Sequence, residues 1–85
     1  MNLKICAVRD QAVDAFGTPY FVPTTGLAIR SFTDEVNREN DDNQLYKHPK
    51  DFTLYELGDY DNNDAKMTMH DQPKLLVSAD QVLTK

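Results

Sequence analysis

The sequence predicts an α+β fold in which a small antiparallel sheet packs on one main helix, with an extended arm bracketed by prolines. Two segments alternate as strands do and carry apolar residues on both faces, so each needs cover on both sides. A third segment has apolar residues at helical spacing and therefore has one stripe to bury. The expected strands are residues 3–8, 52–60 and 65–69, and the expected helix is residues 26–37.

The first expected strand, residues 3–8, should be central in the sheet. Apolar residues occupy both of its alternating sets of positions, and the run stops at Arg9 and Asp10. Cys6, the single cysteine of the chain, lies inside the run and is expected to be a buried, inert thiol. The following residues 11–16 are too short to distinguish a helical turn from a loop.

The arm follows, between Pro19 and Pro23. The two prolines remove backbone donors and push the residues before them toward extended geometry. Tyr20 and Phe21 should therefore project in different directions from an extended segment. Such an arm buries itself poorly, so we expect it to pack on a neighbour in a homo-oligomer, most simply a dimer.

The helix expected over residues 26–37 can be capped by Thr24 or Thr25. Its apolar stripe consists of residues 27, 28, 29, 32 and 36. Arg30, Asp34 and Arg38 lie four residues apart on the exposed side, where they should form two weak ion pairs.

The second half of the chain predicts a loop, a hairpin and a short last element. Residues 37–44 contain no apolar side chain and should form a solvated loop. The polar run 61–64 should return the strand 52–60 into residues 65–69 as an antiparallel partner. Pro73 should start the last element, in which residues 75–77 are apolar and Ser78 caps a final turn.

Composition indicates one globular domain, residues 1–85. The chain is 40% hydrophobic and 27% charged, which is too apolar for a disordered segment. A chain this short buries only about 60 to 65% of its unfolded surface, which again favours an oligomer. The net charge of −5 counts against a simple nucleic-acid binder, although the acids gather at residues 33–43 and 58–64.

No motif indicates an enzyme, a cofactor or a membrane segment. Asp59, Asp61 and Asn63 resemble the opening of an EF-hand loop, but its glycine and its final glutamate are missing, so no metal is expected. His48 and His70 have no companions at ligand or triad spacing and should lie on the surface or in the hairpin. The absence of a long apolar run argues against secretion and membrane spanning, which leaves a reducing cytoplasm.

Aromatic and basic side chains occur together in several places. Single-stranded nucleic acid binds where bases stack on exposed aromatic rings while Lys and Arg follow the phosphates. The four Phe side chains are expected in the core, whereas the Tyr rings suit core and surface equally because each keeps a polar end in water. The candidate nucleic-acid-binding residues are Arg9, Tyr20, Arg30, Tyr46, Lys47, Lys50 and Tyr55.

Three short segments stand in order along the chain. They are Pro19-Tyr20-Phe21-Val22-Pro23, then Gly26-Leu27-Ala28-Ile29-Arg30-Ser31-Phe32, and then His48-Pro49 followed by Leu54-Tyr55-Glu56-Leu57-Gly58. In order and spacing they resemble the small nonstructural proteins of gokushoviruses, the single-stranded DNA phages of the Microviridae. The resemblance covers residues from about 3 to about 60 and implies a role near single-stranded DNA replication or packaging.

Two functions therefore follow as hypotheses. The first is a non-enzymatic phage protein that binds single-stranded DNA in the host cytoplasm during genome replication or packaging. The alternative is a small acidic oligomeric regulator that binds replication or procapsid proteins without contacting DNA. A scaffolding role is weaker, because scaffolding proteins favour long amphipathic helices and the sequence predicts none.

Overall fold

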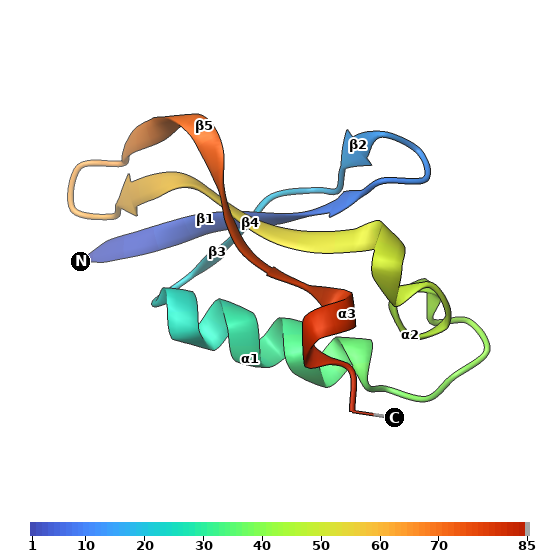
Figure 1. The fold of residues 1–85 in the computed structure, drawn as a ribbon. Helices are drawn as coiled ribbons and strands as arrows, with labels where there is room; N and C mark the ends of the chain where they lie inside the picture. Colours follow the sequence, from blue (N-terminus) through green and yellow to red (C-terminus); the bar gives the residue numbers. More distant parts are fainter. Residues whose placement is uncertain (85) are drawn as a thin grey trace.

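The structure is a computed structural model that describes residues 1–84 of the chain. A five-stranded antiparallel sheet forms one layer, and the helices lie against one of its faces (Figure 1). The α+β fold is confirmed. The strands are β1 (Asn2–Asp10), β2 (Ala15–Phe16), β3 (Tyr20–Val22), β4 (Phe52–Asp61) and β5 (Lys66–Ser78). The helices are α1 (Thr25–Val36), α2 (Gln44–Lys47), the 3₁₀ turn η1 (Pro49–Asp51) and α3 (Ala79–Val82).

The sheet is organised around β1 and β4, as their two-sided apolar pattern predicts. The strand order is β2-β1-β4-β5, and β3 also pairs with β1. The pairing of β1 with β4 shifts between Ile5 and Cys6, which lie opposite Gly58 and Glu56, so that Leu57 is an extra residue on β4. This β-bulge changes which side chains of β4 share a face beyond that point.

The proline-bracketed arm is extended as predicted, and it is only partly buried. Its three residues Tyr20–Val22 form β3, in which Val22 lies opposite Lys4 and Phe21 opposite Ile5. Val22 is buried in the main core, while Phe21 points to the other face of the sheet. Backbone pairing with β1 holds the arm in the sheet, while the Phe21 ring keeps about half of its surface in solvent.

Helix α1 covers one face of the sheet. Thr24 caps it by accepting a hydrogen bond from the Leu27 amide at 3.1 Å, and its buried stripe is Ala28, Phe32 and Val36. The predicted cap and end of the helix are confirmed. The predicted ion pairs through Asp34 do not form; Arg38 instead binds Glu35 at 2.7 Å, and both side chains are about half exposed.

The hairpin of β4 and β5 is confirmed, but β5 runs well beyond the expected residues 65–69. Met69 lies opposite Gly58 and Lys74 opposite Glu56, so four residues of β5, 70–73, stand against the single residue Leu57. Pro73 therefore lies in an excursion of β5 and does not start a new element. In Figure 1 β5 bends sharply as it descends toward α3.

The main core lies between the sheet and helices α1 and α3. Its buried residues include Cys6, Phe32, Phe52 and Leu54. Cys6 is fully buried, as predicted, and burial raises the pKa of its thiol to about 11, so it stays protonated. The final turn predicted after Ser78 is confirmed as α3, where the Gln81 side chain accepts from the Ser78 amide at 3.0 Å.

Candidate nucleic-acid interface

The face of the sheet opposite α1 and α3 is covered by no helix of the described chain (Figure 1). Directly opposed residues of an antiparallel pair point to the same face. Cys6 and Leu54 point into the main core. Ile5 and Ala7, the neighbours of Cys6 along β1, therefore point to this other face. We call it the open face. Its exposed members are Phe16, Phe21, Met67, Met69 and Leu75, and its half-buried members are Tyr55 and Tyr60.

Two pairs of aromatic rings lie on the open face. Phe16 of β2 contacts Tyr55 of β4 edge to face, with ring centroids 5.3 Å apart and planes at 69°. Phe21 of β3 contacts Tyr60 of β4 in the same manner, at 5.2 Å and 66°. In each pair, the Phe ring comes from a short strand on one side of β1 and the Tyr ring from β4 on the other side. The two rings therefore meet above β1.

The rings explain two buried residues that lie outside the main core. Ile5 is 3% exposed and Ala7 is fully buried, although no helix covers them. Ala7 lies opposite Tyr55, and its small side chain leaves room above β1 for the two rings to meet. Phe16 and Phe21 remain 42% and 45% exposed, so each pair still presents ring surface to solvent.

The placement of Phe16 and Phe21 corrects a prediction. Both were expected in the core, where Phe32 and Phe52 do lie. They leave the core because short strands that pair with β1 direct them to the open face. Tyr60 joins them for a different reason. It is five residues from Tyr55, so regular alternation would place the two on opposite faces, and the extra residue at Leu57 returns both to the same face.

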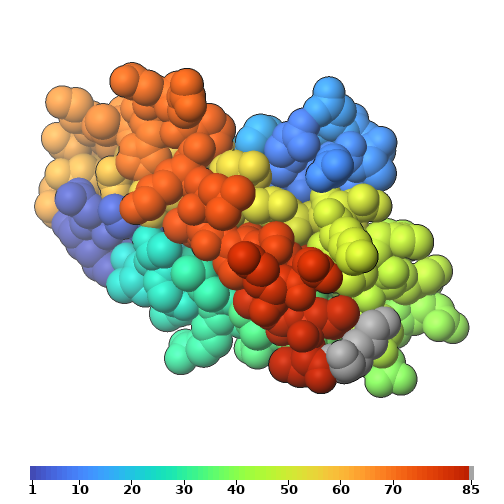
Figure 2. All heavy atoms as spheres, in the orientation of Figure 1, coloured from blue at the N-terminus to red at the C-terminus, as the bar shows by residue number. Residues whose placement is uncertain are grey.

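Exposed aliphatic side chains of β5 continue the open face. Met67 lies opposite Tyr60, and Leu75 lies opposite Tyr55. Met67, Met69 and Leu75 are each more than half exposed. Figure 2 shows a hollow on this side of the molecule, between the first half of β5 and the turn that joins β1 to β2, with β4 at its floor.

Basic and acidic side chains lie together at one end of the open face. Arg9 is opposite Phe16 and forms an ion pair with Asp14 in the β1–β2 turn. At the same end, the Gln11 amide donates to the Asp51 carbonyl at 2.7 Å, which joins this turn to η1. Beside that contact, a shallow depression of about 380 Å³ is lined by Lys47, His48, Pro49, Lys50 and Asp51.

A family model described as Phage ORF5 protein matches residues 3–82, which include every strand and helix of the fold except the first residue of β1. The chain belongs to this family. It is therefore a phage protein, as the sequence segments implied. No curated protein and no solved structure matches the chain. Within residues 1–84 of this ORF5-family protein, no helix is long and apolar enough to cross a membrane.

The structure brings only part of the predicted site together in this ORF5-family protein. Arg9 and Tyr55 lie on the open face, and Lys47 and Lys50 lie at its charged end. Tyr20 lies opposite Cys6 on the helix-covered face, where burial raises the pKa of its hydroxyl.

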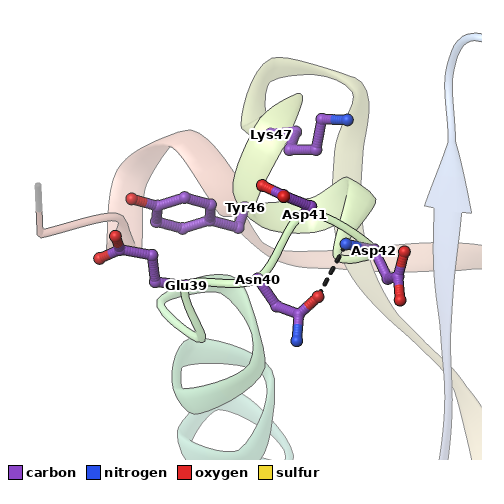
Figure 3. Close-up of a pocket in the computed structure, with 6 residues that line it drawn as sticks. All are labelled: Glu39, Asn40, Asp41, Asp42, Tyr46 and Lys47. Atoms are coloured by element: carbon purple, nitrogen blue, oxygen red, sulfur yellow. Dashed lines mark hydrogen bonds between the residues drawn. The ribbon is translucent and has the colours of Figure 1, made fainter.

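The last two predicted residues lie elsewhere. Arg30 is on the exposed side of α1. Tyr46 lines a separate open pocket of about 620 Å³ with Glu39, Asp41 and Asp42 (Figure 3). Three carboxylates and one basic side chain, that of Lys47, line this pocket, and its excess of negative charge disfavours a phosphate nearby.

A buried carboxylate ties the sheet to α1. Glu56 is 4% exposed and accepts hydrogen bonds from the Thr25 hydroxyl at 2.8 Å and from His70 at 2.7 Å. Burial acts to raise the pKa of Glu56, but the hydrogen bonds from His70 and Thr25 and the charge of Lys4 outweigh it and lower the pKa. His70 was expected on the surface or in the hairpin; it lies in β5 of that hairpin, where the excursion carries it onto Glu56.

Proposed function

We propose that this phage protein binds single-stranded DNA on the open face of its sheet and acts without catalysis in genome replication or packaging in the host cytoplasm. The observation that carries the proposal is the pair of aromatic contacts, Phe16 with Tyr55 and Phe21 with Tyr60, exposed above β1. The ordered segments that resemble gokushovirus nonstructural proteins support it independently.

The chemistry of the open face suits unpaired bases. A base of a single strand exposes its π-face and stacks on an aromatic ring with little regard to sequence, whereas bases in a duplex are already stacked. Arg9 supplies a charge for the phosphate beside Phe16, and Lys47 and Lys50 extend the positive charge past that end. Asp59, one of the acidic residues, binds Lys4 at 2.7 Å, which partly neutralises it.

Fluorescence anisotropy tests the proposal with labelled single-stranded and duplex oligonucleotides at two salt concentrations. We expect binding that prefers single strands, with a shallow salt slope of roughly −0.7 per phosphate contacted. Tyr55→Ala should weaken binding by about 1 to 3 kcal/mol without changing that slope, and Arg9→Ala should reduce the slope. Tyr46→Ala removes the same ring from the acidic pocket and serves as the matched control.

Absence of binding to single strands at low salt with micromolar protein would overturn this proposal. The second candidate, an acidic oligomeric regulator that binds replication or procapsid proteins, would then take its place. A specific observation favours it: Met67, Met69 and Leu75 of β5 are apolar side chains on the open face that are each more than half exposed. A homodimer through this stretch should appear by light scattering and should dissociate when Met67 and Met69 are both changed to Lys, whereas a monomer mass for wild type at micromolar concentration excludes it.

A further inference from the structure

We infer that the open face holds a run of three to five nucleotides along β1, with one base at each aromatic pair. This inference rests on the proposed binding of single-stranded DNA, and it adds where the strand runs and how much of it one molecule contacts. The two aromatic pairs are its foundation, because both lie above the same strand of the sheet.

The register sets the separation of the pairs. Phe16 lies opposite Arg9 and Phe21 opposite Ile5, so the rings on one side of β1 are offset by four residues of that strand. On the other side, Tyr55 lies opposite Ala7 and Tyr60 opposite Leu3, again an offset of four. At a rise of about 3.4 Å per residue, both offsets amount to roughly 14 Å.

That separation defines the length of the ligand. A strand stacked at about 3.4 Å per nucleotide covers roughly 14 Å in four steps, so five nucleotides place a base at each pair. A more extended strand covers the same distance in fewer steps. Three nucleotides are the fewest that place a base at each pair with one nucleotide between them. A dinucleotide reaches one pair alone.

The two pairs differ in charge. Arg9 adjoins the Phe16–Tyr55 pair and can hold the phosphate of the base that stacks there. The lysines of the strands around the Phe21–Tyr60 pair, Lys4 and Lys66, point to the other face, opposite Asp59 and Asp61. The N-terminal ammonium lies 3.9 Å from the Asp61 carboxylate. The Phe16–Tyr55 pair should therefore capture short strands first, and the Phe21–Tyr60 pair should contribute only when the strand extends past it.

Oligothymidylates of two, three, five and eight nucleotides test this in chemical-shift titrations of the isotope-labelled protein at low salt. We expect affinity to rise steeply between two and five nucleotides and to change little beyond five. Tyr55→Ala should weaken binding of every length. Tyr60→Ala should weaken the eight-nucleotide strand by about 5- to 150-fold and leave the dinucleotide within about twofold of wild type.

Two variants control for folding and ring chemistry. Tyr60→Phe keeps the ring and should bind like wild type, while Tyr46→Ala lies off the open face and should change no length. Equal losses for the dinucleotide and the eight-nucleotide strand in Tyr60→Ala, or no rise in affinity between two and five nucleotides, would overturn the inference while DNA binding stands. Failure of every length to bind would instead overturn the proposed function and the inference with it.

Discussion

Gly58 is the position where the backbones of β4 and β5 approach too closely for any side chain. A Cβ atom placed on Gly58 would lie 2.4 Å from the Thr68 carbonyl oxygen and 2.8 Å from the Met69 Cα. Both atoms belong to the backbone, so no side-chain rotation relieves the contact and β5 itself must move. Overpacking of this kind costs about 1 to 3 kcal/mol of unfolding free energy. Gly58→Ala should therefore lower the melting temperature by about 4 to 8 °C for each kcal/mol lost.

Thermal and denaturant unfolding followed by circular dichroism measures this loss. Gly26→Ala is the matched control, because its nearest neighbour would be the Thr24 hydroxyl at 4.0 Å, in the first turn of α1. That variant should be as stable as wild type or more stable by about 0.4 to 1 kcal/mol, since Ala restricts the unfolded chain. A Gly58→Ala protein within about 0.5 kcal/mol of wild type would refute the packing argument.

Three further predictions concern charged groups. Asp14→Asn should raise the affinity for single-stranded DNA by up to about fivefold, because it releases Arg9 from an exposed ion pair. Asn tolerates the φ of 56° at this position. Unchanged or weaker binding in anisotropy would contradict this prediction. His70→Ala should lower the unfolding free energy in urea by about 1.5 to 3 kcal/mol, because the buried Glu56 carboxylate then keeps only the hydrogen bond from the Thr25 hydroxyl. His70→Gln can still donate a hydrogen bond and should lose less. The lowered pKa of Glu56 means that its stabilisation is present above the ordinary value of 4.5 and is lost as pH falls through the folded value; urea unfolding across acidic pH should show this loss, and Glu56→Gln should flatten it.

Sequence patterns predicted the elements whose signals are local. The Thr24 cap, the stripe of α1 and the hairpin turn each depend on neighbours within a few positions. The cap is present, the turn lies at residues 62–65, one position later than predicted, and the stripe is present except for Leu27, which is exposed. The full length of β5 was missed because Pro73 signals an interruption, and only the pairing of Lys74 with Glu56 shows that the strand resumes. The contact of His70 with Glu56 was missed for the same reason.

The candidate interface was less predictable. Tyr55 and Arg9 were named. Phe16 and Phe21 were not, because Phe rings are expected in the core, and Tyr60 was not singled out among the Tyr rings. Their position depends on the register of two very short strands against β1 and on a bulge at Leu57, and neither leaves a periodic trace in the sequence. The available signal was the sequence context of the two rings: Phe16 precedes Gly17, and Phe21 lies between Pro19 and Pro23.

The excursion of β5 at residues 70–73 also bears on how the protein behaves when it accumulates. β5 is the last strand of the sheet, and an uninterrupted edge of its thirteen residues would be a template for a strand of another molecule. The excursion divides that edge into two short stretches, Pro73 offers no amide hydrogen to a partner, and Lys66 and Lys74 place charges along it. The same four residues that bring His70 to Glu56 thus also disfavour edge-to-edge aggregation between molecules at high concentration.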